Sequence, residues 1–123
     1  MIEESYVSFN TAKLLKEAGF DVPCTSQYTE GMGVWNVEYP YNFNQDEFGY
    51  SRPTQALADR WLREVYNVAI YSLYDDDMEQ WFYVVDAFTK NPAINGFQSG
   101  SEYDDYESAF EDGLQEAIKL IKK

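Results

Sequence analysis

Apolar residues recur at steps of three and four along three stretches of the chain, the spacing that places them on one side of a helix. The pattern predicts helices over Phe9–Ala18, Arg52–Tyr66 and Asp105–Lys122. Ser8 precedes the first helix and can accept hydrogen bonds from its free N–H groups. Gly19 follows it and can adopt the left-handed conformation that ends a helix. We therefore expect these two residues to bound the first helix.

The other two helices carry start signals of the same kind. Ser51 or Arg52 is expected to cap the second helix. Asp104 followed by Glu107 matches a capping box at the start of the third. Gly113 lies inside the third helix, where glycine costs about 1 kcal/mol relative to alanine. This position therefore weakens an otherwise regular helical pattern.

Alternating β-favouring residues predict a strand over Val34–Tyr39 in the first half of the chain. Gln27–Tyr28 is expected to pair with it across a turn at Glu30–Gly33, which makes a hairpin. Pro40–Tyr50 follows with no period and predicts a long loop. Loops of this length in compact domains are usually functional or mobile, so this segment is a candidate for function.

A second hairpin is predicted from Val68–Tyr74 and Gln80–Phe88, joined by the acidic turn Asp75–Glu79. Ala93–Gln98 is a candidate for a short third strand, which Gly96 weakens. The second half of the chain therefore has the order helix, strand, strand, short strand, helix.

Together these elements predict a single α+β domain over residues 1–123, with three helices packed on one face of a small antiparallel sheet. Its core is expected to contain the apolar residues of the helical stripes and one row from each long strand. These residues are Leu15, Leu57, Trp61, Leu62, Val65, Ile70, Phe82, Val84, Phe110, Leu114 and Ile118.

Composition excludes several classes of enzyme. The chain contains no histidine, which removes histidine-dependent triads, histidine zinc sites and histidine general bases. Cys24 is the single cysteine, so neither an internal disulfide nor a cysteine-cluster metal site can form. Cys24 has no basic neighbour and is expected to be a small buried residue rather than a nucleophile. We expect no metal and no cofactor.

The chain has no apolar run long enough to cross a membrane. Its acidic start, Met1–Glu4, lacks the basic and apolar stretches of a signal peptide. We therefore expect a cytoplasmic protein with no membrane partner.

Two stretches resemble a known family. They are Ser51–Val65, followed by Asn67-Val68, and Glu4–Asp21. With the acidic final helix, they are similar to a group of small, functionally uncharacterised proteins carried by phages and prophages of Bacteroides-type gut bacteria. The resemblance implies an origin in a mobile element and a cytoplasmic location in the host cell, and it carries no catalytic residue over to this chain.

The net charge of −13 is concentrated between Glu64 and Glu116, where Lys90 is the one basic residue. One interpretation is an acidic mimic of DNA that occupies the basic groove of a host DNA-binding protein. The other is that charge keeps a small aromatic-rich protein soluble. The ridge that a mimic would need is Asp75, Asp77, Glu79, Asp104, Asp105, Glu107, Glu111 and Asp112.

The acidic residues also admit two weaker interpretations. Asp75–Glu79 could bind a hard cation through oxygen ligands, but it lacks the glycine and distant glutamate of an EF-hand loop. A carboxylate-dependent enzyme needs only two acids at a set separation. Because the chain has 22 acidic residues, sequence spacing singles out no pair. We therefore expect no enzymatic activity.

Direct binding to nucleic acid is not expected. Arg60 and Arg63 have helix partners in Glu64 and Asp59, four residues away in each case. A chain with a net charge of −13 also repels phosphate.

Aromatic residues make up 18% of the chain, too many for a disordered acidic tail. Five of them surround the predicted loop and form either a binding patch or an apolar cluster beneath it. They are Tyr39, Tyr41, Phe43, Phe48 and Tyr50. The sequence favours an accessory protein that binds another protein, and it leaves the partner and the oligomeric state open.

Overall fold

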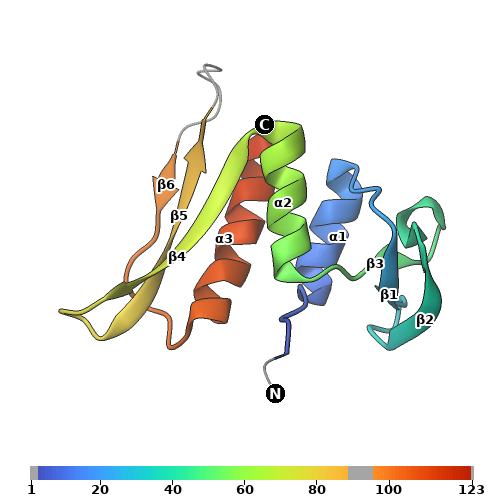
Figure 1. Ribbon diagram of the computed structural model, residues 1–123, viewed down its shortest axis with the longest axis horizontal. Helices are drawn as coiled ribbons and strands as arrows, with labels where there is room; N and C mark the ends of the chain where they lie inside the picture. Colours follow the sequence, from blue (N-terminus) through green and yellow to red (C-terminus); the bar gives the residue numbers. More distant parts are fainter. Residues whose placement is uncertain (1–2, 89–95, 123) are drawn as a thin grey trace. The chain divides into compact units, whose positions relative to one another are not determined.

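The computed structural model describes residues 3–88 and 96–122 (Figure 1). The chain divides into two compact units, Met1–Leu57 and Ala58–Lys123. The described residues form three α-helices and two three-stranded antiparallel sheets, which confirms the α+β class. The predicted strands thus belong to two sheets rather than one, because the strands of each unit pair with one another.

The first unit contains helix α1 and a sheet of order β2-β1-β3. Its elements are α1 (Phe9–Ala18), β1 (Cys24–Tyr28), β2 (Val34–Tyr41), the 3₁₀ helix η1 (Phe43–Gln45) and β3 (Tyr50–Ser51). The bounds of α1 are as predicted. The N–H of Thr11 donates to the Ser8 hydroxyl (3.3 Å), and Gly19 has a φ of 96°. Both predicted ends of the helix are therefore confirmed.

The β1–β2 hairpin is also confirmed, with Tyr28 opposite Val34. The pairing then becomes irregular. Asn36 lies opposite Ser26 and Tyr41 lies opposite Cys24, so four residues of β2 face one residue of β1. Such a bulge leaves residues 37–40 with less cross-strand pairing than a regular ladder provides.

The segment Pro40–Tyr50 is not one long loop. It contains the end of β2, η1 and the start of β3. The Asn44 side chain holds it in place: its amide nitrogen donates to the Phe20 carbonyl (2.8 Å), and its amide oxygen accepts from the Ser51 N–H (2.8 Å). A single polar side chain therefore gives the segment order that hydrophobic periodicity does not reveal.

Helix α2 spans Gln55–Tyr66 and begins three residues later than predicted. Ser51 belongs to β3, and the cap is Thr54, whose hydroxyl accepts from the Leu57 N–H (3.1 Å). Neither Ser51 nor Arg52 caps the helix, because both lie in the extended segment that leads into it. The two predicted ion pairs of α2, Arg60–Glu64 and Arg63–Asp59, are present.

The second unit contains the sheet β4-β5-β6 and helix α3, which packs on β4 and β5 (Figure 1). These elements are β4 (Val68–Asp75), β5 (Gln80–Ala87), β6 (Phe97–Gln98) and α3 (Tyr106–Ile121). The short third strand is confirmed at 97–98, whereas residues 93–95 of the predicted range lie outside the described residues. Asp105, not Asp104, caps α3: its carboxylate accepts from the Ser108 N–H (2.7 Å).

The prediction of which row of β5 side chains is buried is wrong. Phe82 and Val84 are half-buried, whereas Tyr83 and Val85 are 6% and 0% exposed. Both rows are apolar, so alternation alone does not decide between them. The choice follows from α3, which covers the row that contains Val85 and its β4 neighbour Ile70.

Two further predicted core residues differ from expectation. Val65 is 55% exposed, and Leu57 is half-buried. The others are buried as predicted: Leu15, Trp61, Leu62, Ile70, Phe110, Leu114 and Ile118.

Candidate functional site

Strand β2 is the most exposed element of the first unit. All eight of its residues are exposed, although its sequence is VWNVEYPY and only Glu38 is charged. Trp35 and Tyr39 are 64% and 75% exposed. Val37, which lies between them in the chain, is 37% exposed, and the three alternate in sequence although the bulge at residues 37–40 interrupts the regular pairing with β1. We name this row, Trp35, Val37 and Tyr39, the β2 row.

The predicted aromatic patch is only partly present at the surface. Tyr39, Tyr41 and Phe48 are exposed and Tyr50 is half-buried, but Phe43 is 4% exposed. Phe43 lies in the interior because η1 turns its side chain inward, beneath the Tyr41 ring (5.1 Å between centroids). Phe43 is therefore a core residue and cannot belong to a binding surface.

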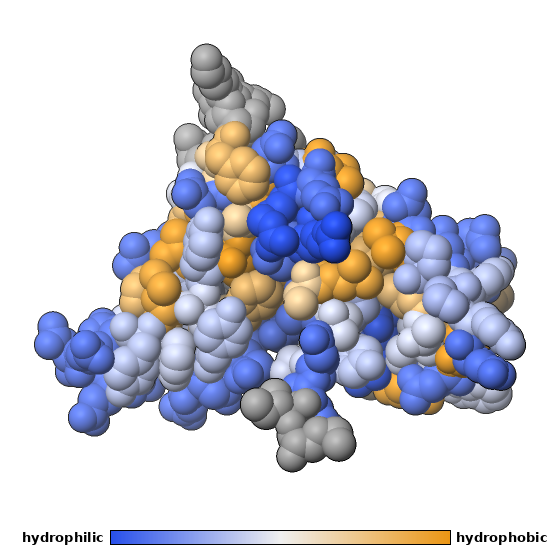
Figure 2. Space-filling model, viewed as in Figure 1, coloured by the Kyte–Doolittle hydropathy of each residue, from blue (hydrophilic) through white to orange (hydrophobic). Residues whose placement is uncertain are grey.

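Sequence reasoning missed Trp35 as a surface residue. An alternating strand with an aromatic row usually has that row against a core. Here neither row of β2 is covered. The second row of the strand contains Asn36 and Glu38, so the alternation predicts a half-buried strand, and no local signal identifies Trp35 as exposed. On the hydropathy scale of Figure 2, the side chains over this sheet are mostly pale or blue, as expected where Trp and Tyr lie among polar groups.

Lys16 holds the segment that follows β2. Its Nζ atom donates to the carbonyl oxygens of Asp46 (2.6 Å), Glu47 (3.3 Å) and Gly49 (2.7 Å). It also lies 4.8 Å from the centroid of the Tyr50 ring. Hydrogen bonds from a charged donor are stronger than neutral ones, so one side chain from α1 orders the end of the segment next to β2.

Replacing Lys16 by methionine keeps the aliphatic stem and removes the charged donor. We expect amide hydrogen exchange in residues 46–50 to become about tenfold faster or more, since a charge-assisted hydrogen bond contributes roughly 1.5–3 kcal/mol. Lys13→Met is the matched control, because Lys13 is on the same helix and lies 5.7 Å from the Phe9 ring centroid. Equal exchange rates in the two variants would contradict the role assigned to Lys16.

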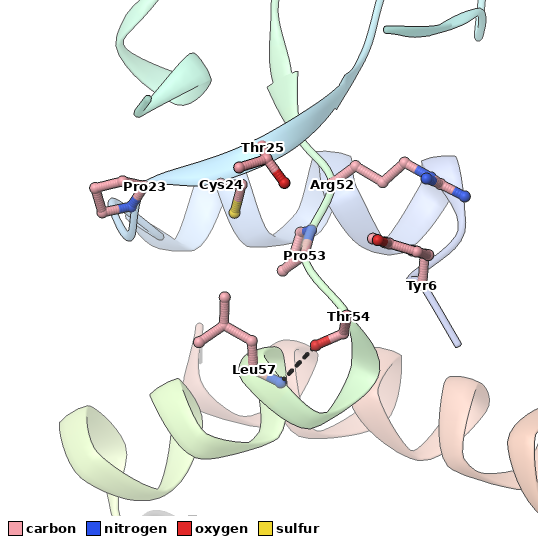
Figure 3. A pocket seen from close by; sticks show the side chains of 8 residues that line it. All are labelled: Tyr6, Pro23, Cys24, Thr25, Arg52, Pro53, Thr54 and Leu57. Atoms are coloured by element: carbon pink, nitrogen blue, oxygen red, sulfur yellow. Dashed lines mark hydrogen bonds between the residues drawn. The ribbon is translucent and has the colours of Figure 1, made fainter. Parts of the chain in front are cut away.

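A small pocket of about 200 Å³ lies in the first unit (Figure 3). Its lining residues are Tyr6, Pro23, Cys24, Thr25, Arg52, Pro53, Thr54 and Leu57. The Arg52 guanidinium stacks on the Tyr6 ring, 4.0 Å from its centroid, and donates to the Ser26 hydroxyl (3.2 Å). Burial raises the pKa of the Cys24 thiol to about 11. The thiol is therefore protonated at neutral pH and does not supply a nucleophile.

The acidic turn between β4 and β5 is tied to the segment before α3. The Ser101 hydroxyl donates to one Asp75 carboxylate oxygen (2.8 Å), and the N–H groups of Asp77 and Met78 donate to the other. The Ser101 hydrogen bond is the main cause of a lowered Asp75 pKa, and the two backbone donors add to it. Asp75 is therefore a structural group of the turn.

The remaining ridge residues lie on or near α3 and in the same turn. Asp105 caps the helix, and Asp112 accepts from the Tyr103 hydroxyl (2.8 Å). Glu111 is half-buried. The other four are exposed: Asp77, Glu79, Asp104 and Glu107. Asp75, Asp105 and Asp112 thus accept hydrogen bonds that hold the local structure together.

Tyr83 is buried beneath α3, and several carboxylate groups lie near it. Its pKa is raised to about 12, first by burial and then by the carboxylates of Glu116, Asp112 and Glu102. The Tyr103 pKa is raised too, by burial and by its hydrogen bond to Asp112. Both phenols stay protonated at neutral pH, and the Tyr103 hydroxyl donates to the Asp112 carboxylate.

The described residues include no group of three cysteine, aspartate or glutamate side chains placed to hold a metal ion. None of the described helices combines the length and apolar character that crossing a bilayer requires. No protein-family model, curated protein or solved structure matches the chain.

Proposed function

We propose that this is a small accessory protein, of phage or prophage origin as its sequence resemblance implies, that acts in the host cytoplasm by binding another protein. The observation that carries the proposal is that all eight residues of β2 are exposed, with Trp35, Val37 and Tyr39 at 64%, 37% and 75%. The proposal is of a binding protein and not of an enzyme.

Physical chemistry supports this use of the surface. Tryptophan and tyrosine are the residues that most often dominate the energy of protein interfaces, because they bury large areas with few rotatable bonds. Glu38 is the only charge on β2, and cores of interfaces are depleted in charge. The Lys16 hydrogen bonds keep the neighbouring segment ordered before any partner arrives, which lowers the entropic cost of binding.

The second candidate function is an acidic mimic that blocks a host DNA-binding protein. The exposed carboxylates of Asp77, Glu79 and Asp104 favour it, together with the contact that ties Asp75 to Ser101 near the start of α3. Its binding would depend on charge, whereas binding through the β2 row would not.

A pull-down from host lysate at low and high salt separates the two. Binding through the β2 row is expected to persist at high salt and to fall at least tenfold in Trp35→Ala/Tyr39→Ala, since interface aromatics contribute about 2 kcal/mol or more each. Binding by a mimic is expected to weaken steeply with salt, because exposed charges are screened within about 8 Å at physiological ionic strength.

The matched control removes charge and leaves the aromatics. Asp77→Asn/Glu79→Gln/Asp104→Asn should keep a partner that binds the β2 row and lose one that binds the acidic residues. Retention of the partner by the aromatic double variant, with loss in the acidic triple variant, would overturn the proposed function in favour of the mimic. Capture of no partner at either salt would overturn both.

A further inference from the structure

The sheet β4-β5-β6 of the second unit has one covered face and one open face. Helix α3 packs on the face that carries Ile70 and Tyr83, with its closest approach at Gly113. Among the described residues of this unit, no helix lies on the opposite face (Figure 1). Side chains of a strand alternate between the two faces of a sheet, so β4 and β5 each present a second row of side chains to the open side.

The centre of the open face is apolar. It consists of two cross-strand pairs, with Tyr71 opposite Val84 and Leu73 opposite Phe82. Tyr71 and Leu73 are 48% and 46% exposed, and the two residues of the middle strand β5 are half-buried. An apolar sheet face is normally buried against another layer. We name these four side chains, Tyr71, Leu73, Phe82 and Val84, the open-face cluster.

Carboxylates lie at both ends of the open-face cluster. Asp86 is exposed at one end, in the same row of β5 as the two apolar residues of the cluster. Asp76, Asp77 and Glu79 are exposed at the other end, in the turn that joins β4 to β5. Residues 68–87 contain five acidic residues and no lysine or arginine. A partner complementary to this face therefore combines apolar side chains with positive charge.

We propose that the open face binds an amphipathic helix of a partner protein, with its apolar stripe on the open-face cluster and basic residues near both of its ends. Strand β4 spans about 20 Å between Ala69, opposite Asp86, and Asp75 at the turn, since each residue advances about 3.3 Å. A helix of this length has about 13 residues. The inference goes beyond the proposed function, because it uses another surface in the other unit and names the chemistry of the partner.

A second copy of this chain is the competing occupant of the open face. In a symmetric dimer the same surface of both copies meets, so the acidic ends of one face would approach those of the other. Like charges brought together across an interface destabilise the complex, whereas a basic helix is attracted to the same carboxylates. Charge complementarity therefore favours the basic helix over self-association.

The test measures the binding of a synthetic peptide to the full chain by isothermal titration calorimetry. The peptide has about 15 residues, with leucines at steps of three and four and a pair of lysines in each terminal turn. We expect it to bind, and to bind more weakly as salt is added. A peptide with glutamate in place of each lysine, and one with its leucines dispersed around the helix, should each bind at least about tenfold more weakly.

Substitutions in the protein locate the site. Leu73→Gln should weaken binding of the basic peptide about tenfold, because it removes apolar area from the centre of the face. Val65→Gln is the matched control, because Val65 is an aliphatic residue of the same unit that is 55% exposed on α2. Asp86→Asn should weaken binding and reduce its dependence on salt. Glu102→Gln, which removes a charge near Tyr83 on the α3 side, should change binding by less than about twofold.

Several results would overturn the inference. They are failure of the basic peptide to bind, equal binding of the basic and acidic peptides, and equal binding by Leu73→Gln and Val65→Gln when circular dichroism shows both to be folded. A wild-type dimer that Leu73→Gln abolishes would assign the face to a second copy. The proposed function is tested separately, because a chain that captures a host protein through Trp35 and Tyr39 but binds no basic peptide overturns only this inference.

Discussion

Replacing Trp61 by alanine is expected to lower the free energy of unfolding by about 3–5 kcal/mol. The indole is 6% exposed and lies edge-on to the Tyr66 ring, 5.4 Å between centroids. Its removal takes away buried apolar area and leaves a cavity that the surrounding helix can fill only in part. Because small domains are stable by only about 5–15 kcal/mol, the variant should be close to unfolding. Urea unfolding followed by far-ultraviolet circular dichroism measures the change.

Trp35→Ala is the matched control for this experiment. It removes the same side chain from a position that is 64% exposed, and substitutions at such positions usually change stability by less than about 0.5 kcal/mol. If both tryptophan variants lose the same stability, then either Trp61 is not a core residue or Trp35 is not on the surface.

Replacing Gly113 by alanine is expected to lower the free energy of unfolding by about 1–2 kcal/mol, although alanine is the better helix former. A Cβ atom at Gly113 would lie 2.7 Å from Ile70 Cγ2 and 3.2 Å from Tyr83 Cβ. Ile70 is β-branched and stiff, and the Tyr83 Cβ moves only with its backbone, so neither atom can yield easily. Overpacking costs about 1–3 kcal/mol, which exceeds the gain of about 1 kcal/mol in helix propensity.

Thermal unfolding of Gly113→Ala and Gly113→Val tests this balance. Valine adds two further methyl groups, and its loss should reach about 3 kcal/mol. Gly100→Ala is the control, because a Cβ there meets no atom within 4 Å. A stability gain in Gly113→Ala would contradict the close approach of α3 to the sheet.

Gly113 shows why helix propensity was a poor guide to this position. From sequence, the glycine is a defect that costs helix stability. In the fold it is the contact point of α3 with β4 and β5, where the absence of a side chain allows the two layers to meet. Propensity is a property of the isolated helix, and the cost of a side chain at Gly113 is set by residues more than twenty positions away in the chain.

The candidate binding surface was predictable only in part. Tyr39 and Tyr41 are exposed as a binding patch requires, but Phe43 is in the interior and Trp35 was not identified as a surface residue. All of these are aromatic residues of similar hydrophobicity. Their exposure depends on which of them the 3₁₀ helix η1 turns inward and on whether another layer covers β2. Neither can be predicted from the local sequence pattern.

By itself, the sequence determined the elements that depend on local interactions. The bounds of α1 follow from Ser8 and Gly19, the first hairpin from its turn at Glu30–Gly33, and the ion pairs of α2 from four-residue spacing, because each depends on groups a few residues apart. Tertiary structure alone decided which row of β5 is buried, why α3 needs Gly113, and that β2 has neither face covered. These outcomes depend on contacts between segments distant in sequence. Where both rows of a strand are apolar, only the layer that packs against the strand determines which row is buried.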